Sequence, residues 1–327
     1  MGYNRLFKIS CMITLLPIFS CIGTSEKKEL KLAHALQVGH PVHQAMEHLA
    51  RRVGELSEGK LVIKVYPAEQ LGSEQQCVEL LQIGSLAMTK VSAAVLEGFI
   101  DDYKVFGLPY LFKSKDHIFK ILDGEIGKEL LLSTENKWIR GLCYYDAGSR
   151  SFYTKSKSIN YPDDLSGMKM RVQPSTTAVE MTRALGGSAT PISYGELYTA
   201  LQSGVVDGAE NSPTSLYISR HYEICKFFSL DEHTTIPDIL VISKLIWDKL
   251  GPQEKLWVQQ AADESALLQR VLWAKSEISA IENLQKAGVK IYRPEKEPFI
   301  LKVQSLLESY KSNPVIYSYI KRIQAVD

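Results

Sequence analysis

The sequence predicts an α/β protein made of two similar lobes that meet at a waist and are braced by one long helix. Strand-like and helix-like segments alternate over residues 30–91, and the same alternation returns over residues 168–209. A helical run then extends from residue 252 to about residue 287. With 327 residues, 45% of them hydrophobic, the chain is long enough to give two ordinary domains a core each.

The first lobe is expected to alternate strictly between strands and helices. Apolar residues recur at helical spacing between Pro41 and Leu56, and Glu58-Gly59 ends that helix. Strands are predicted over residues 30–35, 61–66 and 86–91, and helices over residues 41–56 and 74–83. Because strand–helix–strand units pair their strands in parallel with right-handed crossovers, this segment predicts a doubly wound unit.

The second lobe is expected to begin at the Asp163-Asp164 turn, after an apolar strand over residues 141–145. Its predicted strands cover residues 168–172, 189–191 and 206–209, and its predicted helices cover residues 177–185 and 194–202. Residues 106–112, FGLPYLF, are interpreted as a packed, kinked connection near the hinge. Beyond Ser229 the chain is predicted to be mostly helical, and 36 residues of helix would reach about 54 Å, farther than one lobe.

The first twenty residues have the layout of a secretory signal. Arg5 and Lys8 precede an apolar run from Ile9 to Phe19, which is too short to favour an uncleaved membrane helix. The segment IFSC at residues 18–21 resembles a bacterial lipoprotein cleavage box, with plain signal cleavage as the alternative. We therefore expect a signal peptide over residues 1–20, lipidation at Cys21 and a tether over residues 21–29.

Composition and motifs argue against several classes of protein. Without residues 1–20 the chain has 36 basic side chains (38 less Arg5 and Lys8) against 37 acidic ones, so nucleic acid is not an expected partner. Familiar catalytic motifs are missing, and we expect neither an enzyme nor a cofactor. His34, His40 and His43 lack the spacing of a zinc site, so no metal is expected. The remaining cysteines, Cys77, Cys143 and Cys225, are expected to form no disulfide.

The segment from Asp164 to Asn211 carries the strongest functional signal. It places Arg171 in an apolar strand, between Met170 and Val172, and it delivers Asn211 at the end of a later strand. The planar donor fork of arginine and the amide of asparagine are suited to holding a carboxylate. From the residues alone, a buried structural ion pair at Arg171 and an Asx turn or helix cap at Asn211 remain equally open.

This segment resembles the solute-binding proteins of tripartite ATP-independent periplasmic (TRAP) transporters. The motifs that carry the resemblance are DLSGMKMRV and LQSGVVDGAEN, supported by QLGSEQQCVELLQIGSLAM at residues 70–88. The resemblance covers about the whole mature chain and implies a two-lobed periplasmic binding protein fold. It also implies discontinuous lobes, which we place at residues 30–147 with about 237–276 and at residues 148–236 with about 277–327.

The resemblance assigns roles to several residues. Arg171 would hold the ligand carboxylate in a bidentate pair, Asn211 would share that carboxylate, and Tyr194 would lie against the ligand. Arg150 matches a second arginine that some members direct at the ligand and others keep near the site. Gln173 lies two places after Arg171 on the same strand face and is expected to bind a hydroxyl. His34, Gln37 and Ser92 are expected to complete the site from the first lobe.

We therefore expect a periplasmic, lipid-tethered receptor that closes two lobes on a small organic acid and delivers it to the membrane subunits of a TRAP permease. A hexuronate such as glucuronate or galacturonate is the favoured ligand, because several donors and acceptors suit hydroxyl groups. C4 dicarboxylates and sialic acid are the alternative ligands. A ligand-sensing lipoprotein and an enzyme on the same fold are the alternative classes.

Overall fold

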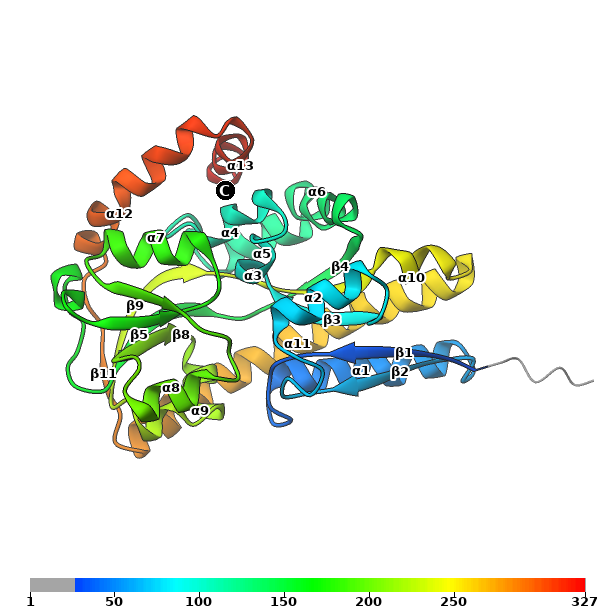
Figure 1. Cartoon of the computed structure of the whole chain (residues 1–327), viewed down its shortest axis with the longest axis horizontal. Helices are drawn as coiled ribbons and strands as arrows, with labels where there is room; N and C mark the ends of the chain where they lie inside the picture. The colour runs from blue at the N-terminus through cyan, green and yellow to red at the C-terminus, as the bar shows by residue number, and fades with distance from the viewer. Residues whose placement is uncertain (1–26, 327) are drawn as a thin grey trace, which may run out of the picture.

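The computed structural model describes residues 27–326, which form two α/β lobes connected through strands and a long helix (Figure 1). The expected signal peptide and the lipidation at Cys21 lie outside the described residues, as does most of the tether. Lys28 and Glu29, expected in that tether, already belong to the first strand. Over residues 27–326, no helix combines the length and the apolar character needed to cross a membrane.

The first lobe is built on a five-stranded sheet in the order β2-β1-β3-β10-β4. The two pairings of β1, with β2 and with β3, are parallel, as the alternating pattern predicted. In contrast, β10 is antiparallel to both β3 and β4. The strands of this sheet are β1 (Lys28–Ala33), β2 (Leu61–Tyr66), β3 (Met88–Ser92), β4 (Ile139–Tyr145) and β10 (Asp238–Ser243).

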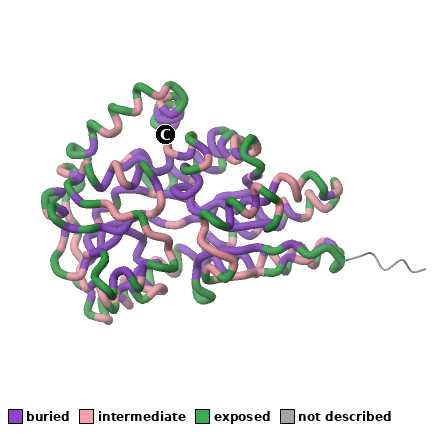
Figure 2. The backbone as a smooth tube through the Cα atoms, in the orientation of Figure 1, coloured by how far each residue is buried: buried purple, intermediate pink, exposed green. Residues whose placement is uncertain are grey.

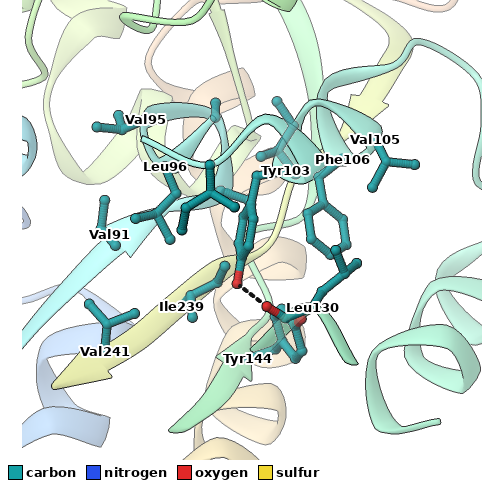
Figure 3. Packing of buried hydrophobic residues seen from close by; sticks show 14 of the residues in the cluster. Val91, Val95, Leu96, Tyr103, Val105, Phe106, Leu130, Tyr144, Ile239 and Val241 are labelled. Atoms are coloured by element: carbon teal, nitrogen blue, oxygen red, sulfur yellow. Dashed lines mark hydrogen bonds between the residues drawn. The ribbon is translucent and has the colours of Figure 1, made fainter. Parts of the chain in front are cut away.

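Helices cover the first sheet, and their buried faces form its core. Tyr103 lies among Val91, Leu96 and Phe106, and its hydroxyl donates a hydrogen bond to the carbonyl of Leu130 at 3.0 Å (Figure 3). The helices of this lobe are α1 (Pro41–Leu56), α2 (Glu74–Gln82), α3 (Ala93–Leu96), η1 (Asp101–Tyr103), α4 (Lys104–Gly107), α5 (Lys115–Asp123), α6 (Glu125–Ser133), η2 (Thr134–Lys137) and α10 (Lys244–Lys249).

The second lobe is built on a six-stranded sheet in the order β11-β9-β5-β8-β6-β7. Its strands are β5 (Ser149–Thr154), β6 (Lys169–Val172), β7 (Ser188–Pro191), β8 (Gly208–Asn211), β9 (Phe227–Thr235) and β11 (Lys290–Tyr292). Its helices are η3 (Pro162–Leu165), α7 (Thr176–Ala184), α8 (Leu197–Ser203), α9 (Pro213–Ile218), η4 (His221–Glu223) and α12 (Glu297–Ser309). In both lobes the buried residues follow the strands and the inner helix faces (Figure 2).

The sequence prediction missed two strand segments. The chain beyond Ser229 is mostly helical, as expected, but β9 first continues to Thr235 and β10 follows directly. All six residues of β10 are buried, so its sequence has no strand-like alternation of apolar and polar residues. These two strands carry the chain from the second sheet back to the first.

The long predicted helix is α11 (Pro252–Lys286), and it contacts both lobes. It packs against α1 and β4 of the first lobe and against α9 of the second (Figure 1). At the connection between β4 and β5, the buried side chain of Gln269 accepts a hydrogen bond from the backbone amide of Asp146 at 2.8 Å. It donates another to the carbonyl of Asp146 at 2.7 Å. The helix α11 therefore contacts the connection between the lobes through two hydrogen bonds from one side chain to the backbone of Asp146.

The C-terminal helices divide between the lobes. Helix α12 packs on α7, whereas η5 (Tyr310–Ser312) leads to α13 (Pro314–Gln324), which packs on α4 and α6. Ile316, Tyr319 and Ile323 belong to the first lobe's core. This differs from the expected division, which placed the whole segment 277–327 in the second lobe. We keep the remaining lobe boundaries as a proposal.

Candidate functional site

Two adjoining cavities lie between the lobes, and the side chains of Glu74, Gln173 and Tyr194 line both of them. The larger measures about 180 Å³ and contains Arg171 in its wall. The smaller measures about 40 Å³ and contains Arg150 together with residues of the first sheet. Because they share three residues, the two cavities form one cleft with a wall from each lobe.

Arg171 is a buried cation with unused hydrogen-bonding capacity. It lies on β6, where its Nε donates to the carbonyl of Ile192 at 2.9 Å and its guanidinium lies 6.0 Å from the centre of the Tyr194 ring. Its Nη1 is buried and has no hydrogen-bond partner among residues 27–326. Burial lowers the pKa of Arg171, because the charged form loses its hydration when it is removed from water. An anion in the larger cavity would give Nη1 a hydrogen-bond partner and would neutralise the buried charge.

Arg150 is buried as well, but it is neutralised. Its Nε forms an ion pair with the carboxylate of Glu210, and its Nη2 donates to both the side chain and the carbonyl of Glu210 at 2.9 Å. Burial alone would raise the pKa of Glu210, but the charge of Arg150 and hydrogen bonds from its neighbours lower it to about 2. Arg150 therefore lines the smaller cavity as one half of a closed ion pair.

Asn211 is the last residue of β8 and lines the smaller cavity. Its Oδ1 accepts from the backbone amide of Ser212 at 2.8 Å and from Nη1 of Arg150 at 3.4 Å. Ser212 in turn caps helix α9 through its own hydroxyl. These contacts occupy the amide oxygen and leave the NH₂ group of Asn211 as the donor toward the cleft.

Tyr194 and Gln173 lie between the two arginines and face both cavities. The Tyr194 hydroxyl is within 2.6 Å of the Ser219 hydroxyl, which fixes the ring against Arg171. The Oε1 of Gln173 is buried and, in the part of the chain that the structure describes, accepts no hydrogen bond. Buried polar atoms are rarely left unpaired, so this acceptor marks a place for a donor group.

The first-lobe wall contains a buried ion cluster that the sequence analysis did not identify. Lys90, on β3, lies 2.5 Å from the carboxylate of Glu74 and 3.2 Å from that of Asp238. All three residues line the smaller cavity. Burial alone would lower the pKa of Lys90, but the charges of Asp238 and Glu74 raise it, so the ammonium is retained. The cluster therefore combines two carboxylates with one cation.

Ser92 and His40 complete this wall. The hydroxyl oxygen of Ser92 accepts from the Ala94 amide at 3.4 Å, and its own amide donates to Glu74 at 3.2 Å. His40 caps helix α1 by accepting from the Val42 amide at its Nδ1, 3.2 Å away. Its Nε2 is buried without a partner in the described chain and borders the smaller cavity, where Trp273 packs beside the ring. A neutral His40 must therefore carry its proton on Nε2, as a donor to the cleft.

Two of the predicted site residues do not line either cavity. His34 is buried with its Nε2 3.0 Å from Nδ1 of His43, and its Nδ1 accepts from the Leu36 amide at 3.1 Å. Burial first, and the charge of Lys90 second, lower the pKa of His34 to about 3. Gln37 is exposed in the loop between β1 and α1. The six others, Arg171, Asn211, Arg150, Tyr194, Gln173 and Ser92, come together around the cleft.

Contacts between the lobes adjoin the cleft. The Oε1 of Glu69, in the loop after β2, accepts from the backbone amide of Gly195 at 3.0 Å at a solvent-exposed position. A Cβ atom on Gly195 would lie only 2.2 Å from the Oε2 of Glu69, so a larger residue at this position would displace the Glu69 carboxylate. The Oε1 of Glu97 similarly accepts from the Thr177 amide of α7 at 2.9 Å. Two first-lobe carboxylates thus bind backbone amides of the second lobe.

No group of three or more His, Cys, Asp or Glu side chains in residues 27–326 is arranged to hold a metal ion. Cys77, Cys143 and Cys225 are buried free thiols. The cleft instead offers an unpaired guanidinium on one side and a polar wall on the other.

The residues that sequence reasoning missed have a recognisable signal. Lys90 interrupts the apolar run LAMTKVSAAV, just as Arg171 interrupts its own strand. Asp238 begins the buried strand DILVIS, in which four apolar residues follow it. A charged residue inside an apolar strand must find a partner or a ligand, and the same argument that selected Arg171 would have selected Lys90.

Residues 32–313 match the family described as bacterial extracellular solute-binding protein, family 7 (DctP). Among curated proteins, the chain is 36% identical over 325 residues to the uncharacterized protein YiiZ of Salmonella typhimurium, covering 99% of this chain and 98% of that one.

Solved structures of related proteins agree with the fold. One is a TRAP periplasmic solute-binding protein from Xanthobacter autotrophicus with bound β-D-galacturonate, 37% identical, with a TM-score of 0.88 over 91% of this chain and all of that one. Another is a TRAP periplasmic solute-binding protein from Anaerococcus prevotii with bound D-glucuronate. It is also 37% identical, with a TM-score of 0.89 over 91% of this chain and 97% of that one.

Proposed function

Because this chain belongs to the bacterial extracellular solute-binding protein family 7, we propose that it is a receptor for a hexuronate such as glucuronate or galacturonate. The ligand is held between the two lobes and is then delivered to a TRAP permease for uptake. The family and the structural neighbours are binding proteins, and the proposal assigns no catalytic step to this chain. The uronates bound in two neighbours at 37% identity support the choice of ligand.

The observation that carries the proposal is the unpaired Nη1 of Arg171. This atom is buried at the larger cavity, and no carboxylate of the described chain is paired with the guanidinium. A ligand carboxylate that binds there gains two charge-assisted hydrogen bonds and neutralises a buried cation. The Tyr194 ring lies 6.0 Å from the guanidinium, and Gln173, Asn211 and Ser92 supply polar atoms for the hydroxyl groups of the sugar.

The ligand class is tested by thermal-shift screening of the purified protein. The panel contains glucuronate, galacturonate, aldonates, C4 dicarboxylates and sialic acid. A ligand at 100 times its dissociation constant stabilises the folded protein by about 2.7 kcal/mol, which gives a clear rise in the melting temperature. A shift with hexuronates supports the proposal, and a shift with another acid replaces the ligand. Recovery of the ligand as a changed compound, measured by NMR, would instead indicate an enzyme.

The role of Arg171 is tested with Arg171→Lys and Arg171→Ala. Lysine keeps the charge but loses the planar fork, so we expect affinity to fall at least about 100-fold with Arg171→Lys, and further with Arg171→Ala. Arg183→Ala is the matched control, because Arg183 is exposed on the adjacent helix α7. Normal uronate binding by Arg171→Lys would disprove the carboxylate contact.

The proposal also includes a lipid anchor at Cys21, which would hold the receptor at a membrane facing the periplasm. The layout of residues 5–21 in the sequence supports it. We expect the full-length protein to fractionate with membranes, and Cys21→Ala to move it into the soluble periplasmic fraction. Equal release of both forms would favour ordinary signal cleavage.

A further inference from the structure

The two walls of the cleft carry opposite net charge. On the second-lobe wall, Arg171 contributes one unpaired positive charge, because Arg150 is neutralised by Glu210. On the first-lobe wall, the carboxylates of Glu74 and Asp238 share the single ammonium of Lys90, so the wall carries one negative charge when both carboxylates are ionised. Burial raises the pKa of Asp238, and the charge of Lys90 opposes this rise. The cleft is therefore polarised from one lobe to the other.

A ligand that spans the cleft meets both walls. Glu74 lines both cavities, so an acid whose carboxylate pairs with Arg171 in the larger cavity presents its other end toward Glu74 and the ion cluster. The cluster is desolvated, since the side chains of Lys90, Glu74 and Asp238 are 3%, 11% and 10% exposed. Charges in such surroundings interact more strongly than in water.

The hydrogen-bonding groups on this wall fit a neutral polyol. The carboxylate oxygens of Glu74 and Asp238 accept hydrogen bonds, as does the unpaired Oε1 of Gln173 opposite, and hydroxyl groups can donate to all of them. His40, whose Nδ1 is occupied, offers one Nε2–H donor to an oxygen of the ligand. A second carboxylate at this end has no proton to donate and would add a negative charge beside two others.

We propose that the Glu74–Lys90–Asp238 cluster is a charge filter that admits the neutral hydroxylated end of a sugar acid and excludes an acid with a second carboxylate. The inference rests on the proposed function and makes it more specific, because it divides monocarboxylate sugar acids from aldarates and C4 dicarboxylates. The second carboxylate would have to give up its hydration and face the acid pair, because Lys90 is already shared by the two carboxylates and Arg150 is already paired with Glu210.

The test compares galacturonate with two open-chain acids, L-galactonate and galactarate, by calorimetric titration of the purified protein. The two open-chain acids differ only in one terminal group, a CH₂OH in L-galactonate and a carboxylate in galactarate. We expect galactarate to bind at least about 100-fold more weakly than galacturonate, which corresponds to about 2.8 kcal/mol at 1.4 kcal/mol per factor of ten. L-Galactonate controls for the loss of the sugar ring.

Variants show whether the cluster causes the discrimination. Asp238→Asn and Glu74→Gln each remove one negative charge while keeping the size and an oxygen acceptor beside Lys90. We expect either to narrow the affinity ratio between galacturonate and galactarate at least about tenfold. Asp263→Asn is the matched control, since Asp263 is a carboxylate of α11 that lines neither cavity and should leave the ratio unchanged.

Each outcome decides the matter. Galactarate binding within tenfold of galacturonate overturns the filter, and so does L-galactonate binding as weakly as galactarate, because the loss of the ring would then explain the weak binding. An affinity ratio that stays the same in both Asp238→Asn and Glu74→Gln also overturns the filter, because shape would then explain the discrimination. If one variant fails to fold, the other still gives the affinity ratio between galacturonate and galactarate. If galacturonate does not bind at all, the proposed function is wrong, and this result is seen before galactarate is tested. The charge filter, which rests on that function, is then rejected as well.

Discussion

Arg150 and Arg171 lie on β5 and β6, two strands that both pair with β8, and both side chains are buried, yet they have opposite surroundings. Arg150 is enclosed by the carboxylate and carbonyl of Glu210. Arg171 has one backbone acceptor and an unpaired nitrogen. A buried charge without its counter-ion costs stability, so it is retained where function requires it. The comparison separates an arginine that supports the fold from one that waits for an anion.

The largest effect is expected from Arg150→Met. This change leaves the buried Glu210 carboxylate with only the His233 ring, 3.6 Å away, as a cationic neighbour, and we expect the unfolding free energy to fall by about 3 to 5 kcal/mol. Urea denaturation of the ligand-free protein measures it. The double variant Arg150→Met/Glu210→Met removes both charges and should recover most of the loss. A single variant as stable as the parent would remove the distinction between the two arginines.

The second prediction concerns His233, which lies 2.7 Å from the Asp231 carboxylate and 3.6 Å from that of Glu210. Burial alone would lower its pKa, but Asp231 and Glu210 raise it to about 9 from the ordinary 6.5. The protonated ring therefore stabilises the fold fully below pH 6.5, and this contribution is lost as the pH rises through 9. We expect a loss of about 3 kcal/mol across this window.

Urea denaturation at pH 6 and pH 9.5 measures that loss, and His233→Gln serves as the control that lacks the titrating ring. His34, whose pKa is lowered to about 3, also contributes at pH 6, but it is present in both parent and variant, so its contribution cancels in the comparison. Equal pH dependence in parent and variant would show that the ion network around Arg150 does not hold a proton at His233.

The smallest change in stability is expected from Arg171→Met. Removal of an uncompensated buried cation offsets the lost hydrogen bond to Ile192, so the melting temperature of the ligand-free protein should stay the same or rise slightly, within about 1 kcal/mol. The same variant should show no thermal shift with galacturonate. A large loss of stability without ligand would mean that Arg171 supports the fold as Arg150 does.

Much of the fold could be predicted from local pattern. The helix from Pro41 to Leu56 and the strand from Leu61 to Tyr66 have the predicted ends, because caps and periodicity are local properties. The strands β9 and β10 were missed since their burial comes from partners on two different sheets. No local signal in a strand of six buried residues says which sheet it will join.

Prediction of the binding site from the sequence has the same limit, because partners from distant segments give no local signal. Arg171 was identified because a charged residue within an apolar strand stands out and because its motif resembles a known family. Lys90 gives the same local signal, but its partners Glu74 and Asp238 come from separate segments that only the folded chain brings together. Gln37, chosen for its place after a strand, is turned to solvent by the loop that leads into helix α1.

The contact between Glu69 and Gly195 has a kinetic consequence. Because it joins the lobes next to Tyr194, which lines the cavities, we expect a ligand to enter only while this contact is broken and the lobes are apart. The observed association rate should then stop rising with ligand concentration and level off at the frequency of opening. Gly195→Ala, which displaces the Glu69 carboxylate and so weakens the contact, should raise that plateau. The receptor would capture its ligand sooner and release it sooner.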